Sequence, residues 1–565
     1  MSSSRRVLFA AALIGACAVG APAPAQDGKV ARSFGAGDGV SAVGVLDAPP
    51  DTEIEGPQAI ASGDNGEIYL LDQVNSRVVA FEPGKPEGLT RSLSLPEGVQ
   101  PTDMVVTGGR IYVWDGKPIR LNESGEGATR SLSLGPRASD DVDDVTRSMF
   151  GQMGSEVIEG EAEPGLTRAI GRPRAGAGPA RVSGKQMVAS KGKGPVSASV
   201  IVDKTEKAAT MTVATRDGAR LGALTLRVRD RIGTAELLDI DKQGRFFVLA
   251  ENISAAGGAN SFVARFTPAG ALEGVFELPL NPEVALSRRF VTVNPEGDVF
   301  FMRTRKGVVD VIGVGFTAMA KGQVVDLGPP PVAAVAPADP RKTPVSAVRP
   351  LTREQVIRTA LAFADVRWRV TPTAYGGDPD LSCNGFNARV RRPSFMIGKT
   401  NQEVKGIPYC WGCMGSLNQI AGRINAGTKA GNVCTRNDPT RDVAGVDCSA
   451  FVSATWGLST HFTTLAIPSI TVPVTNPWDM KPGDALNKPG SHVMLFTGFT
   501  PDRKIEVIEA SPGACAGKVC RNVYTLASLL ARGYTARRYR ALVDEVAMAT
   551  PAPRPARQRP ARDQN

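Results

Sequence analysis

Four short segments of this chain share one local pattern, in which a turn with glycine is followed by one further residue and a run of apolar β-forming residues. The segments are DNGEIYLLD (64–72), TGGRIYVWD (107–115), KQGRFFVLA (242–250) and PEGDVFFMR (295–303). Glycine readily adopts the positive φ that tight hairpin turns require. The pattern therefore predicts four β-hairpins, and the recurrence of one hairpin indicates a repeat architecture.

The spacing of these hairpins sets the expected fold. Their glycines are Gly66, Gly109, Gly244 and Gly297, separated by 43, 135 and 53 residues. Repeats of about 40–45 residues with four strands each are typical of β-propeller blades. Because the large gap is about three such repeats long, two weaker blades fit inside it. We therefore expect an all-β propeller of about six blades over residues 30–328.

One of the expected blades carries a family resemblance. The segment GDNGEIYLLDQVNSRVVAFEPG (63–84) resembles an NHL repeat, with Asp72, Asn75 and Arg77 in the loop of that repeat. Residues 136–195 are irregular, so the middle blades are eroded there or carry an insertion. The propeller region has no acidic pair or histidine that indicates chemistry. We expect a binding or spacing module whose ligand is a protein or a glycan.

Composition separates the propeller from a second domain. Residues 329–350 are rich in Pro and Ala without an apolar period, which indicates a semi-extended linker. Residues 546–565 have a similar composition and predict a disordered tail. Between them, residues 351–545 begin with a helical pattern for which Thr352 is the expected N-cap. The chain is therefore expected to be multidomain.

The N-terminal 25 residues have the layout of a secretory signal peptide. Arg5 and Arg6 precede about fifteen mostly apolar residues, and APA (23–25) offers a cleavage site. The apolar run is shorter than the ~20 residues of a membrane span, and no later segment is longer and equally apolar, so we expect a soluble mature protein without a transmembrane segment. IGAC (14–17) also resembles a lipoprotein cleavage box, which would leave Cys17 acylated. The expected location is the periplasm or cell envelope, with secretion or a lipid anchor as alternatives.

Charge and histidine content narrow the possible partners. The formal net charge is +10, and residues 351–545 hold 23 Lys and Arg against 15 Asp and Glu. This excess suits an anionic envelope surface and suits solubility equally well. Export argues against a nucleic-acid partner. The chain has only His461 and His492, which excludes a histidine-rich metal site and leaves two candidate bases for cysteine chemistry.

Seven cysteines besides Cys17 lie in the last third of the chain. An exported protein normally forms disulfides, and an odd number leaves one thiol over. We expect Cys515 and Cys520 to pair across a short loop. The CxxC motif of Cys410 and Cys413, taken with Cys383 and Cys434, allows disulfides, a four-cysteine zinc site or a redox-active pair, of which disulfides are favoured. The cysteines concerned are Cys383, Cys410, Cys413 and Cys434. No metal or other cofactor is predicted.

The remaining thiol, Cys448, lies in GVDCSAFVSATWGL (445–458). The residues behind it suit a helix that packs Phe451, Val452 and Trp456 inward. A thiolate is the reactive form of cysteine, and its pKa falls at a helix N-terminus and beside a histidine. This placement predicts that Cys448 is a nucleophile. A buried, inert cysteine is the alternative.

A base and an orienting group follow in the sequence. His492 stands at the start of the apolar strand HVMLFTGF (492–499), and KIEVIEAS (504–511) predicts an adjacent strand. Alternation along that strand places Glu509 on the side of Val507, where its carboxylate can bind the far imidazole nitrogen. His461 is the rival base, but its position in a loop is typical of a surface or substrate-rim residue.

These residues carry a second resemblance. GIPYCWGC (406–413), GVDCSAFVSATWGL and KPGDALNKPGSHVMLF (481–496) resemble the three blocks of the NlpC-type papain-like cell-wall peptidases. The resemblance implies an α+β fold for residues 351–545, with a nucleophile helix packed on an antiparallel sheet that carries the base. It implies hydrolysis of amide bonds in peptidoglycan stem peptides, commonly next to D-glutamate.

The resemblance also assigns roles to individual residues. It places the nucleophile at Cys448, the base at His492 and the third polar group at Glu509. Tyr409 matches a tyrosine near the oxyanion site. Two further residues, Asp447 and Ser449, match the pair that meets the free amine of the stem peptide.

The sequence departs from the family pattern at Ala450, where glycine is usual, at Cys413, where a second glycine is common, and at Glu509, an uncommon third residue. The leading hypothesis is an exported cysteine endopeptidase or amidase whose propeller targets it to its substrate. The alternatives are a non-catalytic envelope scaffold with a degenerate papain-like domain, and a thiol acyltransferase that shares the acyl-enzyme step.

Overall fold

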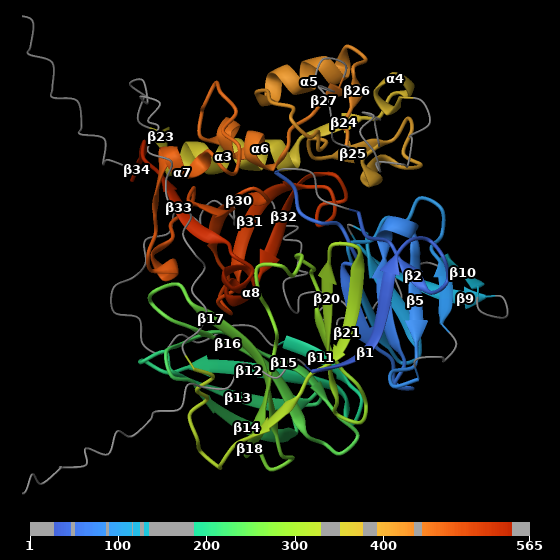
Figure 1. The fold of residues 1–565 in the computed structure, drawn as a ribbon, viewed down its shortest axis with the longest axis vertical. Helices are drawn as coiled ribbons and strands as arrows, with labels where there is room; N and C mark the ends of the chain where they lie inside the picture. Colours follow the sequence, from blue (N-terminus) through green and yellow to red (C-terminus); the bar gives the residue numbers. More distant parts are fainter. Residues whose placement is uncertain are drawn as a thin grey trace, which may run out of the picture.

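The computed structural model describes residues 28–46, 51–85, 90–115, 117–124, 129–134, 186–328, 351–376, 392–433 and 443–544. Residues 28–328 form the sheet-rich region, and residues 351–544 form the C-terminal region. Figure 1 shows the C-terminal region, from yellow to red, stacked against the sheet-rich region, from blue to green. The predicted signal peptide, linker and tail lie outside the described residues, as do Cys17, Cys383 and Cys434.

The described part of the sheet-rich region forms four sheets, which divide into five antiparallel units of four strands each. Four of them are built from consecutive strands. The first consists of β3 (Ala59–Ser62), β4 (Ile68–Asp72), β5 (Arg77–Phe81) and β6 (Arg91–Ser94), and the second of β7 (Asp103–Thr107), β8 (Arg110–Trp114), β9 (Pro118–Ser124) and β10 (Thr129–Leu134). The third consists of β11 (Gln186–Ser190), β12 (Gly194–Val202), β13 (Ala208–Thr215) and β14 (Arg220–Arg227). The fourth consists of β15 (Arg231–Ile240), β16 (Phe246–Ile253), β17 (Ala259–Phe266) and β18 (Leu272–Glu277).

The fifth sheet joins the two ends of the region. Strands β19 (Val291–Val293), β20 (Val299–Arg305) and β21 (Val308–Gly313) continue into β1 (Lys29–Ala36), which pairs antiparallel with β21. Two short strands extend sheets at their edges, β2 (Ala42–Val43) beside β1 and β22 (Phe316–Ala318) beside β18. Strands β6 and β10 pair in parallel, so the first two sheets are continuous.

The four predicted turns each connect the first and second strands of a sheet. Gly66, Gly109, Gly244 and Gly297 all have positive φ, between 68° and 88°. The predicted hairpins are therefore confirmed, and their glycines are required by backbone geometry. The inner strands of successive sheets lie in contact, β3 with β7 and β19, and β15 with β11 and β19.

This arrangement is propeller-like, with five blades among the described residues instead of the six or so predicted. A sixth would have to fall within residues 135–185, outside the described part of the chain. In the NHL-like segment, Asp72 accepts hydrogen bonds from Asn75 (2.8 Å) and from Arg77 (2.8 Å), which fixes the loop after β4.

The C-terminal region is built on a six-stranded antiparallel sheet with helices packed on it. In spatial order its strands are β28 (Thr471–Pro473), β33 (Thr535–Tyr539), β29 (Ala485–Lys488), β30 (His492–Phe499), β31 (Ile505–Ser511) and β32 (Lys518–Tyr524). Helix α6 (Cys448–Thr455) contacts β30 and β31, and α3 (Arg353–Asp365) contacts α6 and β32. As predicted, Thr352 is the N-cap of α3, and its side chain takes part in a capping box.

Smaller elements complete this region. Three two-stranded ladders pair β23 (Leu351–Thr352) with β34 (Leu542–Val543), β24 (Arg367–Arg369) with β25 (Glu403–Lys405), and β26 (Lys429–Ala430) with β27 (Val443–Ala444). The short helices are α4 (Pro372–Tyr375), α5 (Leu417–Asn425), α7 (Ile467–Ile470) and α8 (Leu526–Ala531). Among the described residues, no helix combines the length and the apolar character that crossing a membrane demands.

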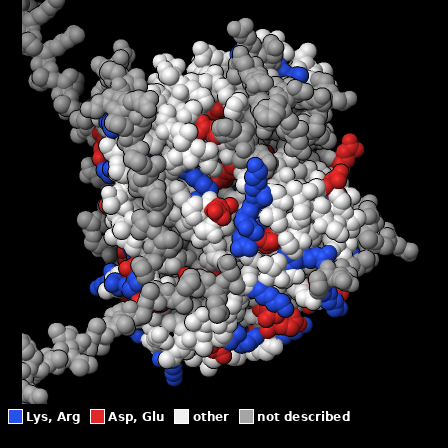
Figure 2. Space-filling view, viewed as in Figure 1, with Lys and Arg blue, Asp and Glu red and all other residues white. Residues whose placement is uncertain are grey.

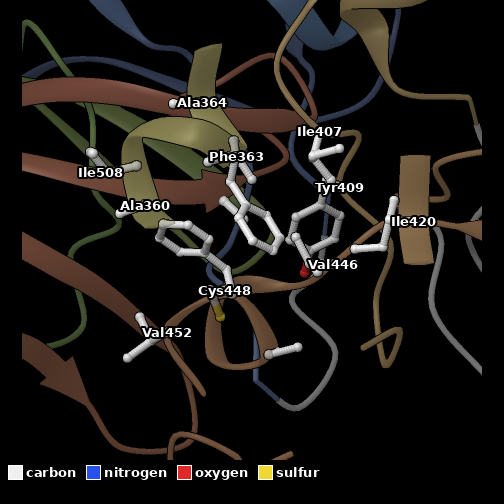
Figure 3. Packing of buried hydrophobic residues seen from close by; sticks show 14 of the residues in the cluster. Ala360, Phe363, Ala364, Ile407, Tyr409, Ile420, Val446, Cys448, Val452 and Ile508 are labelled. Carbon is white, nitrogen blue, oxygen red and sulfur yellow. The ribbon is translucent and has the colours of Figure 1, made fainter. Parts of the chain in front are cut away.

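Two hydrophobic cores cover the two faces of the central sheet. On one face, Phe363 of α3 meets Phe451 of α6 edge-on at 5.7 Å between ring centroids, and Figure 3 shows Phe363 near Cys448. On the other face, Leu486, Met494 and Phe496 pack with residues of the sheet-rich region, including Ile253 and Leu286. This second core therefore contains residues of both regions. Through it, the central sheet that carries His492 packs on the propeller-like array.

Charged side chains are intermixed on the face drawn in Figure 2. Lys and Arg lie beside Asp and Glu where the two regions meet and over the sheet-rich half. The positive excess of the sequence therefore does not gather into one basic patch on this face.

Candidate active site

Cys448 is the first residue of α6, as the sequence predicted. Asp447 is the N-cap, and its carboxylate accepts a hydrogen bond from the backbone N–H of Ala450 at 2.7 Å. The predicted inward residues of this helix, Phe451, Val452 and Trp456, are all buried. Cys448 is the one unpaired cysteine among the described residues, and its side chain is buried completely.

His492 opens strand β30, and Glu509 lies on the neighbouring strand β31. The imidazole Nε2 and the Glu509 Oε2 are 2.6 Å apart. Because Nε2 is engaged with the carboxylate, Nδ1 is the ring nitrogen left for the thiol of Cys448. The structure thus brings together the predicted nucleophile, base and third group.

The electrostatics of this triad form one coupled system. Burial would lower the pKa of His492, but the charges of Cys448 and Glu509 and its bonds to both hold the pKa well above the usual value. Burial would raise the pKa of Glu509, but the hydrogen bond to His492 keeps it below the usual value. Burial raises the pKa of the Cys448 thiol, against the opposing effect of His492. The mutual attraction of Cys448 and His492, together with Glu509, therefore favours a thiolate–imidazolium pair, whereas burial disfavours both charges.

Glu509 is held by two residues that the sequence analysis missed. The Asn522 side-chain amide and the Tyr524 hydroxyl each donate to Glu509 Oε1 at 2.6 Å. Both residues lie on β32, which pairs with β31. Their alternation with the rest of that strand places them on one face, but nothing local in the sequence identifies the face as that of Glu509.

Tyr409 lies beside the nucleophile. Figure 3 shows its ring next to Phe363, with the hydroxyl on the side of Cys448. The hydroxyl is buried and makes no hydrogen bond to the described residues. Burial and then the nearby charge of Cys448 raise its pKa well above the usual value, so it is a neutral donor. This hydroxyl is free to donate to an oxygen that develops charge near Cys448.

Asp447 and Ser449 form a polar cluster with the second histidine. Asp447 Oδ2 accepts from the backbone N–H of Gly412 at 2.9 Å, and the Ser449 hydroxyl is 2.7 Å from His461 Nε2. Burial lowers the pKa of His461, but its contact with Asp447 (3.3 Å) outweighs this and raises the pKa. His461 therefore belongs with the predicted amine-binding pair and is not an isolated surface residue.

The cysteine predictions are tested in part. Cys515 and Cys520 form a disulfide, as predicted, and Cys410 pairs with Cys413 within the CxxC motif. The described residues contain no group of three or more His, Cys, Asp or Glu side chains arranged to hold a metal ion. Since Cys383 and Cys434 lie outside those residues, how they pair stays a prediction.

A segment of the sheet-rich region covers the thiol, which the sequence analysis did not foresee. The backbone carbonyl oxygen of Asp51 is 3.4 Å from Cys448 Sγ. The Asp51 carboxylate accepts from the backbone N–H of Thr464 at 3.1 Å and from the Thr464 hydroxyl. We name residues 51–55 the cover. The sequence did not predict the contact between the cover and Cys448, because residues 51–55 lie some 400 positions before the nucleophile.

Two hollows border the cover. One, with about 370 Å³ of empty space, is lined by the cover together with Tyr409 and His492. The other is an open hollow of about 1250 Å³ between the two regions, bordered by Thr52, Glu53 and Ile54 and by Lys488. The cover therefore lies between the open hollow at the surface and the smaller hollow beside His492.

Comparison with known proteins returns structures but no family. No family model matches the chain, and no curated protein does. A structure of streptogramin B lyase covers 48% of this chain and 96% of its own, at 10% identity and a TM-score of 0.19. Virginiamycin B lyase from Staphylococcus aureus covers 48% and 70%, at 10% identity and a TM-score of 0.15. The PQQ-bound aldose sugar dehydrogenase from Streptomyces coelicolor covers 48% and 98%, at 10% identity and a TM-score of 0.19.

Proposed function

We propose that the chain is an exported cysteine endopeptidase or amidase of the NlpC-type papain-like class that hydrolyses amide bonds in peptidoglycan stem peptides. The observation that carries this proposal is the placement of Cys448 at the N-terminus of α6, with His492 next to it and bonded to Glu509. A buried thiol beside a carboxylate-oriented imidazole is the constellation of nucleophilic acyl transfer.

The chemistry follows from these positions. His492 Nδ1 takes the thiol proton, and Cys448 Sγ attacks the amide carbonyl carbon. The Tyr409 hydroxyl is placed to donate to the resulting oxyanion. His492 then gives its proton to the leaving amine, which leaves a thioester. Water, deprotonated by His492, attacks the thioester, and the acid product and the free thiol are released. Glu509 stabilises the imidazolium in both halves.

Three features support the substrate class. The cluster of Asp447, Ser449 and His461 includes both residues that flank the nucleophile in the sequence, and it offers a carboxylate to an ammonium group. The three sequence blocks resemble those of cell-wall peptidases, and the signal-peptide pattern places such an enzyme where peptidoglycan lies. In this proposal the propeller-like array binds a protein or glycan of the envelope.

The test is digestion of purified peptidoglycan by the full-length protein, with mass spectrometry of the released stem peptides. Wild type should release fragments with a new free carboxyl and a new amine, and Cys448→Ala should release none. Equal products from both would refute the proposal. Asp64→Ala serves as the matched control, because Asp64 is an exposed residue of the sheet-rich region that belongs neither to the triad nor to the cluster around Asp447.

A non-catalytic scaffold is the second candidate, and the complete burial of Cys448 under the cover favours it. Under that alternative, no digestion occurs even when the thiol is accessible. A thiol acyltransferase would form the same thioester but pass the acyl group to an amine, so product analysis with an added amine separates the two reactions.

A further inference from the structure

The structure assigns a positioning role in the proposed triad to Arg288, a residue of the sheet-rich region. This inference rests on the proposed function, because the triad it concerns is the one proposed there. Arg288 lies between β18 and β19, next to Leu286, which packs into the core shared by the two regions. Its guanidinium reaches across the boundary to Asn522, which binds the Glu509 oxygen that is not bonded to His492.

The contacts of Arg288 are specific. Its Nη2 donates to the backbone carbonyl of Ala514 at 2.6 Å and to the side-chain oxygen of Asn522. The amide nitrogen of Asn522 then donates to Glu509, and Glu509 binds His492. A chain of hydrogen bonds therefore runs from Arg288 through Asn522 and Glu509 to the imidazole.

A guanidinium is suited to this position because it donates and never accepts. The Asn522 amide has one accepting end and one donating end. Arg288 occupies the accepting end, so the donating end must face the Glu509 carboxylate. A residue without a donor here would leave the Asn522 oxygen unpaired and its amide free to turn, which loosens the carboxylate that orients His492.

The burial of Arg288 argues against a purely structural role. The residue is almost fully buried, and its Nε and Nη1 make no hydrogen bond to the described residues. Removing a charged group from water is unfavourable unless it is well paired. The neighbouring Arg289 contrasts with it, because that guanidinium forms a salt bridge with Asp103 inside the sheet-rich region. The salt bridge of Arg289 stabilises the sheet-rich region itself. The contacts of Arg288 lead instead through Asn522 to the triad.

The test uses the full-length protein and its two histidines. With ¹⁵N-labelled histidine, only His461 and His492 give imidazole signals, and His461→Gln assigns them. In Arg288→Met the pKa of His492 should fall and that of His461 should stay. The turnover number should drop roughly tenfold with KM nearly unchanged, the size expected for losing one buried hydrogen bond to the triad.

Two further variants make the inference falsifiable. Asn522→Ala should have the same effect as Arg288→Met, and the double variant should be no worse than either, since both break one chain of contacts. Arg289→Lys is the matched control and should leave His492 unchanged. The positioning role of Arg288 would be overturned if the losses of turnover of the two single variants multiplied in the double variant. It would also be overturned if the His492 titration were unchanged in folded Arg288→Met. The titration needs no substrate, so it remains decisive if peptidoglycan proves not to be cleaved.

A separate observation carries a second inference: we infer that the cover, residues 51–55, blocks the proposed active site and must leave before substrate binds. An attacked carbonyl has to lie about 3–3.5 Å from the nucleophile. The Asp51 carbonyl group already occupies that space, with its oxygen 3.4 Å from Cys448 Sγ. Substrate and cover therefore exclude each other.

The cover is held by polar anchors at its first residue and at its middle residue. Asp51 bonds to Thr464 through its side chain and to the Gly490 carbonyl through its backbone N–H (3.3 Å), and Glu53 accepts from the Tyr534 hydroxyl at 2.6 Å. Asp51 also has a φ of 65°, which is unfavourable for a residue with a side chain. Anchored, strained backbone of this kind is released when its anchors are removed. Its release would join the two bordering hollows into one groove that leads to Cys448.

Alkylation of Cys448 tests the cover directly. Iodoacetamide is added to the full-length protein, and modification of the Cys448 peptide is followed by mass spectrometry. The double variant Asp51→Ala with Glu53→Gln should react roughly tenfold faster than wild type, because the thiol becomes exposed and its pKa falls with renewed solvation. Thr464→Val removes one anchor from the opposite side and should also accelerate alkylation.

Asp64→Ala is the matched control, because Asp64 is an exposed aspartate of the same region that accepts a hydrogen bond from the backbone N–H of Gly109 and lies outside the cover. It should leave the rate at the wild-type value. Unchanged rates in folded Asp51→Ala with Glu53→Gln and in Thr464→Val would overturn the inference. Faster alkylation without peptidoglycan digestion would uphold the cover and reject the enzyme.

Discussion

At the scale of single residues, Glu509 links the most interactions in the site. It receives hydrogen bonds from Asn522 and Tyr524 on one oxygen and binds His492 through the other. Strand alternation placed it on the side of Val507, and the resemblance to the peptidase blocks supplied the prediction that this side faces His492. Asn522, Tyr524 and Arg288 could not be predicted, because their distance from Glu509 depends on strand register and on the docking of two regions.

Glu509→Gln should lower turnover roughly 10- to 100-fold while the protein stays folded, since the variant keeps a hydrogen-bonding shape but loses the charge that stabilises the imidazolium. Glu509 raises the pKa of His492, so the alkaline limit of activity should move to lower pH in the variant. The check is the pH profile of kcat/KM. Glu509→Ala should lose more, and Cys448→Ala most. Full activity in Glu509→Ala would remove Glu509 from the mechanism.

At the scale of elements, helix α6 shows what local sequence can predict. The apolar spacing gave its buried face, and its start at Cys448 was expected. The role of Asp447 as its N-cap was not, although aspartate is among the preferred residues at that position. Strand β30 beginning at His492 was likewise predicted from the turn before it. Elements bounded by turn and cap residues are local, and they are the part of the site that the sequence predicts.

Asp447→Ala should destabilise the protein by about 1–2 kcal/mol, because α6 loses its cap. Asp447→Asn should cost less, since asparagine also caps helices. Urea denaturation measures both free energies. Thr352→Ala is the matched control, because it removes the cap of α3 at a similar cost without touching the site. Cys448 alkylation should therefore change in Asp447→Ala and stay constant in Thr352→Ala.

At the scale of the whole molecule, the two regions are joined by buried polar groups as well as by their shared core. Lys504 of the C-terminal region pairs with Glu236 of β15 at 2.8 Å, and both are buried. Glu251 of β16 accepts from the backbone N–H of Ala527 at 3.0 Å. The propeller-like array was predictable from hairpin repeats, but its docking was not, because buried residues such as Ile253 read as part of a blade. The number of blades also depended on residues with no clear pattern.

Glu251 should make stability depend on pH. Burial raises its pKa from 4.5 to about 7, so the folded protein holds a proton that the unfolded chain releases between these values. Its contribution is therefore full below pH 4.5, declines by up to about 3 kcal/mol as pH rises to 7, and is constant above. Glu251→Gln should remove this decline. Urea denaturation at pH 5 and pH 8 measures the free energy of unfolding of both proteins. If this free energy changed with pH equally in wild type and in Glu251→Gln, the assignment would be contradicted.

The pairing of β1 with β21 has a consequence for the order in which the molecule is completed. The fifth sheet cannot close until the chain has been made as far as Gly313, and its closure fixes β1 and β2, which lead into the cover. Cys448 is made more than a hundred residues later. A chain that folds as it lengthens can thus complete its sheet-rich region before its thiol exists. The residues that anchor the cover, Thr464, Gly490 and Tyr534, follow Cys448 in the chain, so the nucleophile of the proposed enzyme is made before the cover can close over it.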